Sequence, residues 1–109
     1  MDIDYKVRIS ILLDYYGNLL TESCYSMLLD RYYNDLSLAE IADRAGITRQ
    51  GVRDSLLRGE KQLLDYEDKL QLKEKSDMTI SKLKEILILS NQAEISGMIE
   101  DMISSMEEN

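Results

Sequence analysis

The sequence predicts an all-α fold, and three observations favour this class. The 109 residues include no proline and only five glycines, so little in the chain would interrupt a helix. Apolar residues recur three and four positions apart nearly throughout, which leaves no room for strand-like alternation. A chain of this length fits one domain that buries roughly two-thirds of its unfolded surface. We therefore expect one helical domain with a helical carboxyl-terminal tail.

Two helices are expected before residue 36. The first covers residues 2–16 and is predicted to end at Gly17-Asn18 in a left-handed stop. Thr21 is a good N-cap for the second helix, which should end at Asn34-Asp35. The tyrosines of both helices resemble the stacking platforms of single-strand binders, but their leucine neighbours favour core packing. The predicted apolar faces are Tyr5, Ile9, Leu12, Leu13 and Tyr16, and Tyr25, Leu28, Leu29 and Tyr32.

Residues 36–56 (LSLAEIADRAGITRQGVRDSL) carry two amphipathic helical patterns that are separated by a short turn. Ser37 and Glu40 are spaced as a capping box, which predicts where the first helix begins. Gly46 stands where the chain must reverse, because glycine takes positive φ without steric cost. Thr48 is a suitable N-cap for the second helix. Leu38, Ile41, Ala42, Val52 and Leu56 are the expected core, and the whole is typical of a helix-turn-helix.

The second helix of this motif presents the candidate nucleic-acid-binding residues: Thr48, Arg49, Gln50, Arg53, Arg58 and Lys61. In a major groove, arginine forms two hydrogen bonds with guanine and glutamine forms two with adenine. Gly51 has no side chain and would let the helix approach a nucleic acid closely. The Asp54 carboxylate would repel phosphate, although Arg58, four residues later, is placed to neutralise this carboxylate. The alternative is that two helices and a glycine turn form a packing unit or a protein-binding module without nucleic acid.

Charge is unevenly distributed along the chain. The formal net charge is −8, which is the wrong sign for a general nucleic-acid binder. Residues 43–61 nevertheless hold five basic and three acidic residues, a net of +2, so the remainder carries −10. Because salt screens charge over about 8 Å under physiological conditions, distant acidic residues would slow association without forbidding local binding.

The carboxyl-terminal part is expected to be a helical extension. Leu56, Leu63 and Leu70 continue the helical pattern to about residue 70, and the polar segment 69–77 reads as a hinge. We therefore divide the chain into a four-helix module, 1–70, and an extension, 71–109. A short helix with Ile80, Leu83, Ile86 and Leu87 should stop at residues 90–92, before a stripe of Ile95, Met98, Ile99, Met102, Ile103 and Met106. Such stripes favour a homodimer seam, or a hairpin folded back on the first module.

Several function classes are disfavoured. Cys24 is the single cysteine and there is no histidine, which argues against an internal disulfide or a Cys/His zinc site. We find no paired carboxylates, metal cluster or phosphate loop, so we expect no enzyme, no metal and no cofactor. No apolar run approaches the roughly 20 residues that span a bilayer, and no targeting segment is recognised. Cytoplasmic residence is the consistent expectation.

The segment YYNDLSLAEIADRAGITRQGVRDSLLRGEKQL resembles region 4 of bacterial sigma factors, and the preceding LLDYYGNLLTE narrows the likeness. Together they are similar to the YlxM family of small helix-turn-helix proteins encoded next to the signal recognition particle GTPase. By this resemblance, Arg49, Gln50 and Arg53 stand where sigma region 4 places promoter-reading side chains. The resemblance implies a non-enzymatic protein that binds nucleic acid, DNA more than RNA, or modulates the signal recognition particle pathway. A protein-binding adaptor is the alternative.

Overall fold

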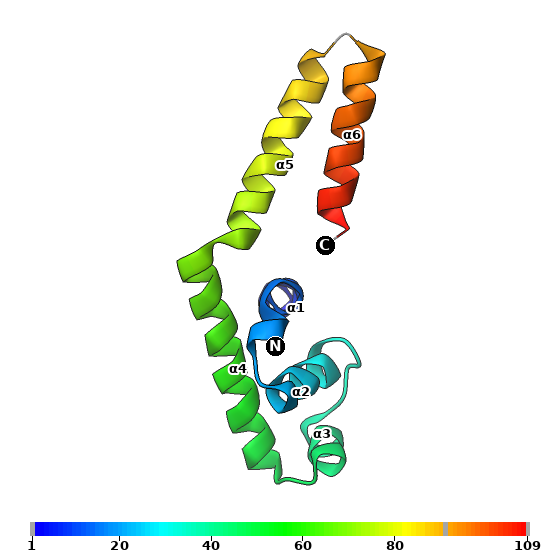
Figure 1. Ribbon diagram of the computed structural model, residues 1–109. Coiled ribbons are helices and arrows are strands. Elements are labelled where there is room, and N and C mark those ends of the chain that lie inside the picture. The colour runs from blue at the N-terminus through cyan, green and yellow to red at the C-terminus, as the bar shows by residue number, and fades with distance from the viewer. Residues whose placement is uncertain (1, 91, 109) are drawn as a thin grey trace. The chain divides into compact units, whose positions relative to one another are not determined.

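The computed structural model describes residues 2–90 and 92–108, which are helical almost throughout (Figure 1). No strand occurs among the described residues, so the prediction of an all-α fold is confirmed. The elements are α1 (Ile3–Tyr16), a short 3₁₀ helix η1 (Gly17–Leu19), α2 (Glu22–Tyr32), α3 (Leu38–Ala45), α4 (Arg49–Leu70), α5 (Leu72–Leu89) and α6 (Ala93–Glu107).

The chain divides into two compact units, residues 1–70 with α1 to α4 and residues 71–109 with α5 and α6. This differs from the single core expected from the chain length. The first unit has a continuous hydrophobic core, to which all four helices contribute. Its buried side chains are Ile9, Leu12, Leu13, Tyr16, Leu20, Met27, Leu28, Tyr32, Ile41, Ala42, Val52, Leu56 and Leu63.

The end of α1 corrects one prediction. Gly17 is not left-handed, since its φ of −54° lies in the right-handed helical region. A glycine is needed there for space: a Cβ at this position would lie 2.4 Å from Cε1 of Tyr25. The close approach of the α2 ring, rather than a helix stop, therefore explains this residue. The cap of α2 is as predicted, with the Thr21 hydroxyl accepting from the Cys24 N–H at 3.3 Å.

The tyrosines mostly pack in the core of the first unit. Tyr16 and Tyr32 are 1% and 7% exposed, so the core interpretation is confirmed for both. Tyr33 is half-exposed instead, and its hydroxyl donates to Oδ1 of Asp14 at 2.6 Å. That bond holds the Tyr33 ring against α1 rather than leaving it free to stack on a base.

Helix α4 buries two carboxylates that the sequence does not reveal. The Tyr5 hydroxyl donates to Oε1 of Glu60 at 2.7 Å, and the Tyr16 hydroxyl donates to Oε1 of Glu67 at 2.6 Å. Both glutamates are 7% exposed, so two of the acidic residues of α4 lie on its inner side. These bonds offset part of the cost of burying charge and attach α1 to α4.

The second unit is a helical hairpin. The polar segment 69–77 was expected to be a hinge, but α5 already begins at Leu72 and the break is confined to Gln71, which has a φ of 55°. The predicted stop after α5 falls at Ser90, where the backbone becomes extended, while Asn91 lies outside the described residues. Ile99 and Ile103 of α6 are the buried side chains among the described residues of this unit.

Candidate nucleic-acid interface

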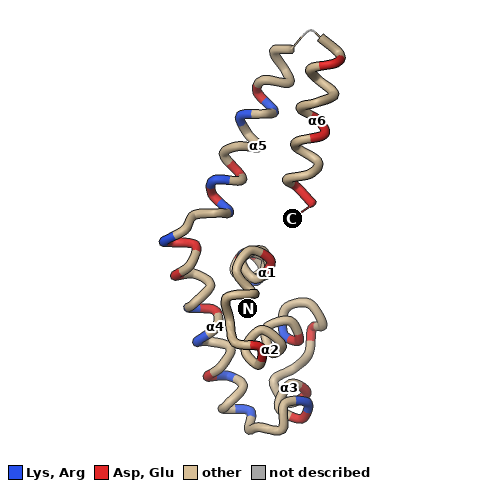
Figure 2. The backbone as a smooth tube through the Cα atoms, viewed as in Figure 1, with Lys and Arg blue, Asp and Glu red and all other residues tan. Residues whose placement is uncertain are grey.

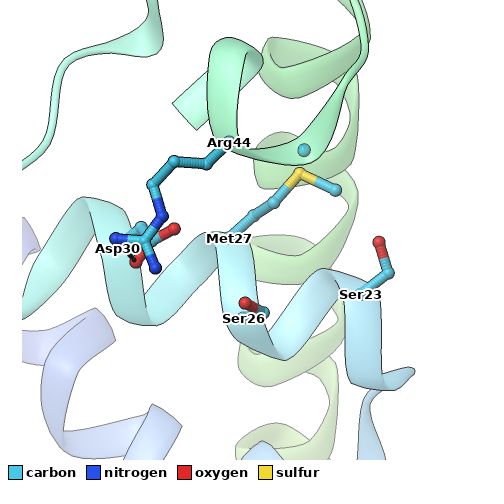
Figure 3. Close-up of a pocket in the computed structure, with 6 residues that line it drawn as sticks. Ser23, Ser26, Met27, Asp30 and Arg44 are labelled. Carbon is cyan, nitrogen blue, oxygen red and sulfur yellow. Dashed lines mark ion pairs between the residues drawn. The ribbon is translucent and has the colours of Figure 1, made fainter. Parts of the chain in front are cut away.

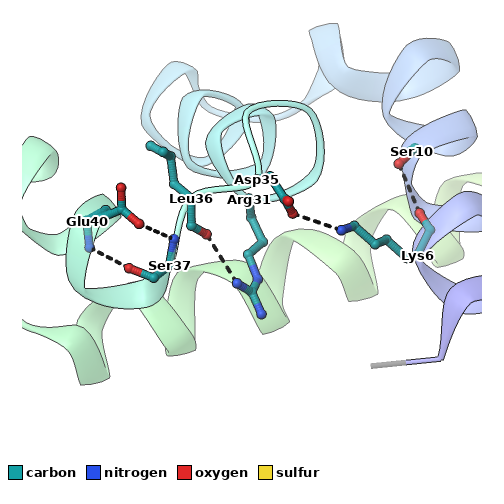
Figure 4. Close-up of polar contacts among 7 residues, drawn as sticks. All are labelled: Lys6, Ser10, Arg31, Asp35, Leu36, Ser37 and Glu40. Atoms are coloured by element: carbon teal, nitrogen blue, oxygen red, sulfur yellow. Dashed lines mark hydrogen bonds and ion pairs between the residues drawn. The ribbon is translucent and has the colours of Figure 1, made fainter.

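Helix α3 is held at its amino-terminal end by short-range polar contacts (Figure 4). The predicted capping box is present: Ser37 Oγ accepts from the Glu40 N–H, and Glu40 Oε1 accepts from the Ser37 N–H, both at 3.1 Å. Before it, Arg31 donates to the carbonyl of Leu36 at 3.1 Å. Left-handed Asp35 pairs with Lys6 at 3.0 Å. The loop between α2 and α3 is therefore tied to both flanking helices.

The turn between α3 and α4 has the predicted geometry. Gly46 is left-handed, with φ 69° and ψ 32°, and its N–H donates to the carbonyl of Ala42 at 2.9 Å. The Thr48 hydroxyl accepts from the Gly51 N–H at 3.0 Å and so caps α4. Because only three residues separate α3 from α4, the two helices must pack closely together, as helix-turn-helix motifs require.

The inward faces of α3 and α4 form a tight apolar contact that fixes which face of α4 points outward. Ile41 and Val52 are fully buried, and Ala42 and Leu56 are 6% and 5% exposed. The predicted core of the motif is confirmed at these four positions. Since α4 buries Val52 and Leu56 on one side, helical periodicity places Gln50 and Asp54 on the opposite side.

All six candidate residues are exposed: Thr48, Arg49, Gln50, Arg53, Arg58 and Lys61. Figure 2 shows basic residues along the amino-terminal half of α4. Among the described residues, none of the four cations in this set lies within 4.0 Å of a carboxylate. Their charge is therefore available to an anionic partner such as a phosphate.

Asp54 does not pair with Arg58, contrary to expectation. Its Oδ1 accepts from Nε2 of Gln50 at 2.9 Å, one turn earlier. Arg58 instead borders a depression of about 160 Å³ beside Cys24 of α2. Burial raises the pKa of the Cys24 thiol, and the positive charge of Arg58 opposes that rise. The direction of the Arg58 side chain toward α2 explains why Asp54 has a different partner.

Arg44 of α3 serves the fold rather than the exposed α4 face. It pairs at 3.5 Å with Asp30 of α2, whose side chain is 9% exposed (Figure 3). Asn34 donates to the same carboxylate at 3.0 Å. Arg44 and Asp30 border a depression of about 230 Å³, which is also lined by Ser23, Ser26, Met27 and Ala45. The positive charge that the sequence assigns to residues 43–61 is therefore partly used to hold α3 on α2.

Two further properties concern the described residues only. In residues 2–90 and 92–108, no group of three or more cysteine, aspartate or glutamate side chains is arranged to hold a metal ion. None of the helices in these same ranges combines the length and apolarity needed to cross a bilayer.

A three-residue turn centred on left-handed Gly46, between two helices that share an apolar contact, defines a helix-turn-helix protein. Residues 3–105 match the family UPF0122, described as "Putative helix-turn-helix protein, YlxM / p13 like". The chain belongs to this family, as its resemblance to YlxM proteins predicted.

Relatives of the same family are found in several bacteria. A UPF0122 protein of Clostridium novyi is 42% identical over 105 residues, covering 94% of this chain and 90% of the relative. One of Desulforamulus reducens is 44% identical over 82 residues, with coverages of 75% and 70%. One of Clostridium kluyveri is 54% identical over 70 residues, with coverages of 63% and 62%.

Proposed function

We propose that this protein is a non-enzymatic regulator that binds duplex DNA through residues 48–61, at the start of α4. The observation that carries the proposal is the exposed amino-terminal part of this helix, where Arg49, Arg53 and Lys61 have no carboxylate within 4.0 Å among the described residues. Arg58 is also exposed and lies on the flank of α4 that is directed toward α2. A helix that follows a tight turn and is anchored on one side is the element that enters a major groove in helix-turn-helix proteins.

The burial of Glu60 supports this proposal. Glu60 is one of the three acidic residues in the segment 43–61, but its side chain is 7% exposed and accepts a hydrogen bond from the Tyr5 hydroxyl. The acidic side chains that the segment exposes are therefore Asp43 and Asp54. The face that a phosphate would meet is more positive than the sequence count indicates. A carboxylate buried behind the helix lies farther from a bound phosphate than an exposed one, and the Coulomb repulsion falls with distance.

Anisotropy titrations of the full chain on labelled duplex DNA, at about 50 and about 200 mM salt, test the proposal. Each phosphate contact should contribute about −0.9 to the slope of log affinity against log salt. A slope near zero, or no binding at the lower salt, would contradict DNA binding. Duplex RNA and signal recognition particle RNA serve as parallel probes, since the family resemblance also implies that pathway.

Arg49→Ala and Arg53→Ala should each weaken binding to a specific duplex by about 1 to 3 kcal/mol, the loss expected for base contacts. Both side chains are exposed, so thermal unfolding should stay unchanged. Arg8→Ala, which removes an exposed arginine on α1, is the matched control and should leave affinity unaltered. Unchanged affinity in the Arg49→Ala, Arg53→Ala double variant would exclude this helix as the contact surface.

The α5–α6 hairpin supports a second proposal, that the protein is a homodimer joined by its carboxyl-terminal helices. Ile95, Met98 and Met102 lie one turn apart on α6 and are 43%, 65% and 52% exposed. Helical geometry places Ile86 of α5, 50% exposed, on the same side of the hairpin. Exposed apolar stripes of this kind are typical of protein interfaces.

The small size of the hairpin core also favours a partner. Units below about 40 residues rarely bury enough apolar surface to be stable without a metal, a disulfide or oligomerisation. A second copy of the hairpin would supply the missing surface symmetrically and complete a four-helix bundle. A two-fold dimer would also present two copies of α4, which could address successive major grooves if they lie about 34 Å apart.

Light scattering after size exclusion tests the dimer. Met98→Glu with Met102→Glu should convert a dimer to a monomer, because the new carboxylates would be buried in the seam. Ser81→Glu with Ser104→Glu adds the same charge at exposed polar positions of the hairpin and should leave the mass unchanged. A monomeric wild type at micromolar concentration would contradict the dimer. A dimer that persists in the methionine variant would contradict this seam.

The alternative function is a protein-binding adaptor or modulator within the signal recognition particle pathway that uses the helix-turn-helix as an interaction module without DNA. A protein interface need show no counterion-release slope. Binding to the signal recognition particle GTPase that Arg49→Ala with Arg53→Ala abolishes, together with no binding to duplex DNA, would favour the adaptor over the DNA-binding regulator.

A further inference from the structure

Two consecutive polar contacts join three residues on the exposed face of α4. Arg53 donates from Nη1 to Oε1 of Gln50 at 3.3 Å, and Gln50 donates from Nε2 to Oδ1 of Asp54 at 2.9 Å. The residues are three and four positions apart, the separations at which side chains on a helix meet. All three are exposed, so the chain of contacts lies on the surface that faces a bound partner.

The two neighbours determine how the Gln50 amide is oriented. A guanidinium has only donors and an ionised carboxylate has only acceptors. If the amide were rotated by half a turn, its N–H groups would face the Arg53 donors and its oxygen would face the Asp54 carboxylate. Both contacts would then be repulsive, so the surroundings select one orientation of an otherwise ambiguous group.

Gln50 keeps a specific hydrogen-bonding capacity after these contacts are made. An amide has two N–H donors and two oxygen lone pairs. Asp54 takes one donor and Arg53 takes one lone pair, which leaves one of each. In the major groove, adenine presents one acceptor, N7, and one donor, the N6 amino group, whereas guanine presents two acceptors. The remaining pair on Gln50 matches adenine and does not match guanine.

We propose that Gln50 is the adenine-reading residue of this protein and that Asp54 and Arg53 are positioning residues that orient its amide. The inference rests on the proposed function, duplex DNA binding by α4. This role also explains why the Asp54 carboxylate lies on a face of α4 that should attract phosphate. Asp54 lowers the general attraction to DNA, and in return it holds the residue that distinguishes one base from another.

Selection from a randomised duplex pool with the full chain, followed by anisotropy on the selected site, tests the assignment. At one position, replacing A·T with G·C should weaken wild-type binding by about 5- to 150-fold, as expected for a bidentate contact. Replacing that adenine with 7-deazaadenine, which lacks the N7 acceptor, should also weaken it. Gln50→Ala and Gln50→Glu should both lose this discrimination, because alanine makes no contact and glutamate cannot donate to N7.

The positioning residues give a result that a purely structural role would not produce. Asp54→Ala should raise affinity for random duplex by up to about 5-fold, because it removes an exposed like charge, and should also reduce the preference for adenine. Asp54→Asn should retain that preference, since its amide oxygen still accepts from Gln50. Gln62→Ala, an exposed glutamine farther along α4, is the matched control and should change neither quantity.

The possible results separate the two proposals. If the wild type binds duplex DNA with a negative salt slope, but Gln50→Ala leaves base preference unchanged at every position, the adenine assignment is overturned and DNA binding stands. Sensitivity to Gln50→Ala without sensitivity to 7-deazaadenine would also overturn it. If the wild type binds no duplex DNA at low salt, the proposed function fails, and the adenine assignment fails with it.

Discussion

Both units of this protein are built from amphipathic helices, but the first unit buries much more of its apolar faces than the second. In the described part of the first unit, residues 2–70, thirteen hydrophobic side chains are buried in one cluster. In the described part of residues 71–109, Ile99 and Ile103 are buried, while Met98 and Met102 are more than half exposed. Both units show apolar residues at helical spacing in the sequence, so the pattern alone does not distinguish a completed core from one that lacks a partner.

The difference between the units shows what tertiary packing adds to amphipathicity. Helix α4 meets α1, α2 and α3 in the first unit, so its apolar face is covered along most of its length. In the second unit, α5 and α6 pack on each other, and two helices can cover only one flank of each apolar stripe. The first unit is therefore expected to be stable in itself, and the second to gain stability from association.

Core truncation in the first unit should have the largest effect. Leu63 is fully buried, so Leu63→Ala should lower the free energy of unfolding by about 2 to 5 kcal/mol. Ile88→Ala, at an α5 position that is 82% exposed, should change it by no more than about 0.5 kcal/mol. Urea unfolding followed by far-ultraviolet circular dichroism reports on the helices of both units, and tyrosine fluorescence reports on the first unit, because all seven tyrosines lie between residues 5 and 66. Equal shifts of the two variants would contradict the comparison.

Replacing a glycine should change stability in opposite directions in the two units. Gly46 is left-handed and no atom lies within 4 Å of an added Cβ, so Gly46→Val is disfavoured by the backbone conformation alone and should cost about 1 to 3 kcal/mol. Gly97 is helical and equally open, so Gly97→Ala should stabilise α6 by up to about 1 kcal/mol. Tyrosine fluorescence would follow the first change and far-ultraviolet circular dichroism the second. Unaltered melting of Gly46→Val would show that the turn lies elsewhere.

The tyrosine contacts should make the first unit sensitive to alkali. Burial, then the hydrogen bond and charge of Glu60, raises the pKa of Tyr5 from 10.0 to about 12. Burial and the hydrogen bond to Asp14 raise the pKa of Tyr33 to about 12 as well. Because the folded protein favours the neutral phenols, their contribution is complete below about pH 10 and is lost as the pH rises through about 12. Urea midpoints of the wild type should fall across this window.

Tyr5→Phe should have a small effect at neutral pH and serves as a control for the pH response. At neutral pH it should cost about 1 kcal/mol, because the Glu60 carboxylate loses a donor. The loss should stay small, because the Tyr32 hydroxyl lies beside Glu60 and is able to donate to this carboxylate in place of Tyr5. Burial, and then the charge of Glu60, raises the pKa of Tyr32. The variant should also lose stability less steeply above about pH 10 than the wild type. An unchanged alkaline slope would show that Tyr5 does not contribute.

The sequence predicted the motif well because its determinants are local. The Ser37–Glu40 capping box, left-handed Gly46 and the Thr48 cap each depend on atoms no more than five residues apart, and all three occur as expected. The exposure of the six candidate residues follows from the same periodicity. The i, i+4 contact of Gln50 with Asp54 was also within reach of the sequence. The sequence prediction paired Asp54 with Arg58, the cation four residues later, and so did not include the contact with Gln50 four residues earlier.

What the sequence determined by itself was therefore the helical class, the turn and the outward face of α4, all of which depend on caps, φ angles and periodicity within a few residues. Only the tertiary structure decided which charges are hidden and where close approach requires glycine. The Tyr5–Glu60 contact joins residues 55 positions apart, and the need for Gly17 arises from the ring of Tyr25 on another helix. Such contacts depend on how helices pack against one another, and residue spacing along one helix carries no information about that packing.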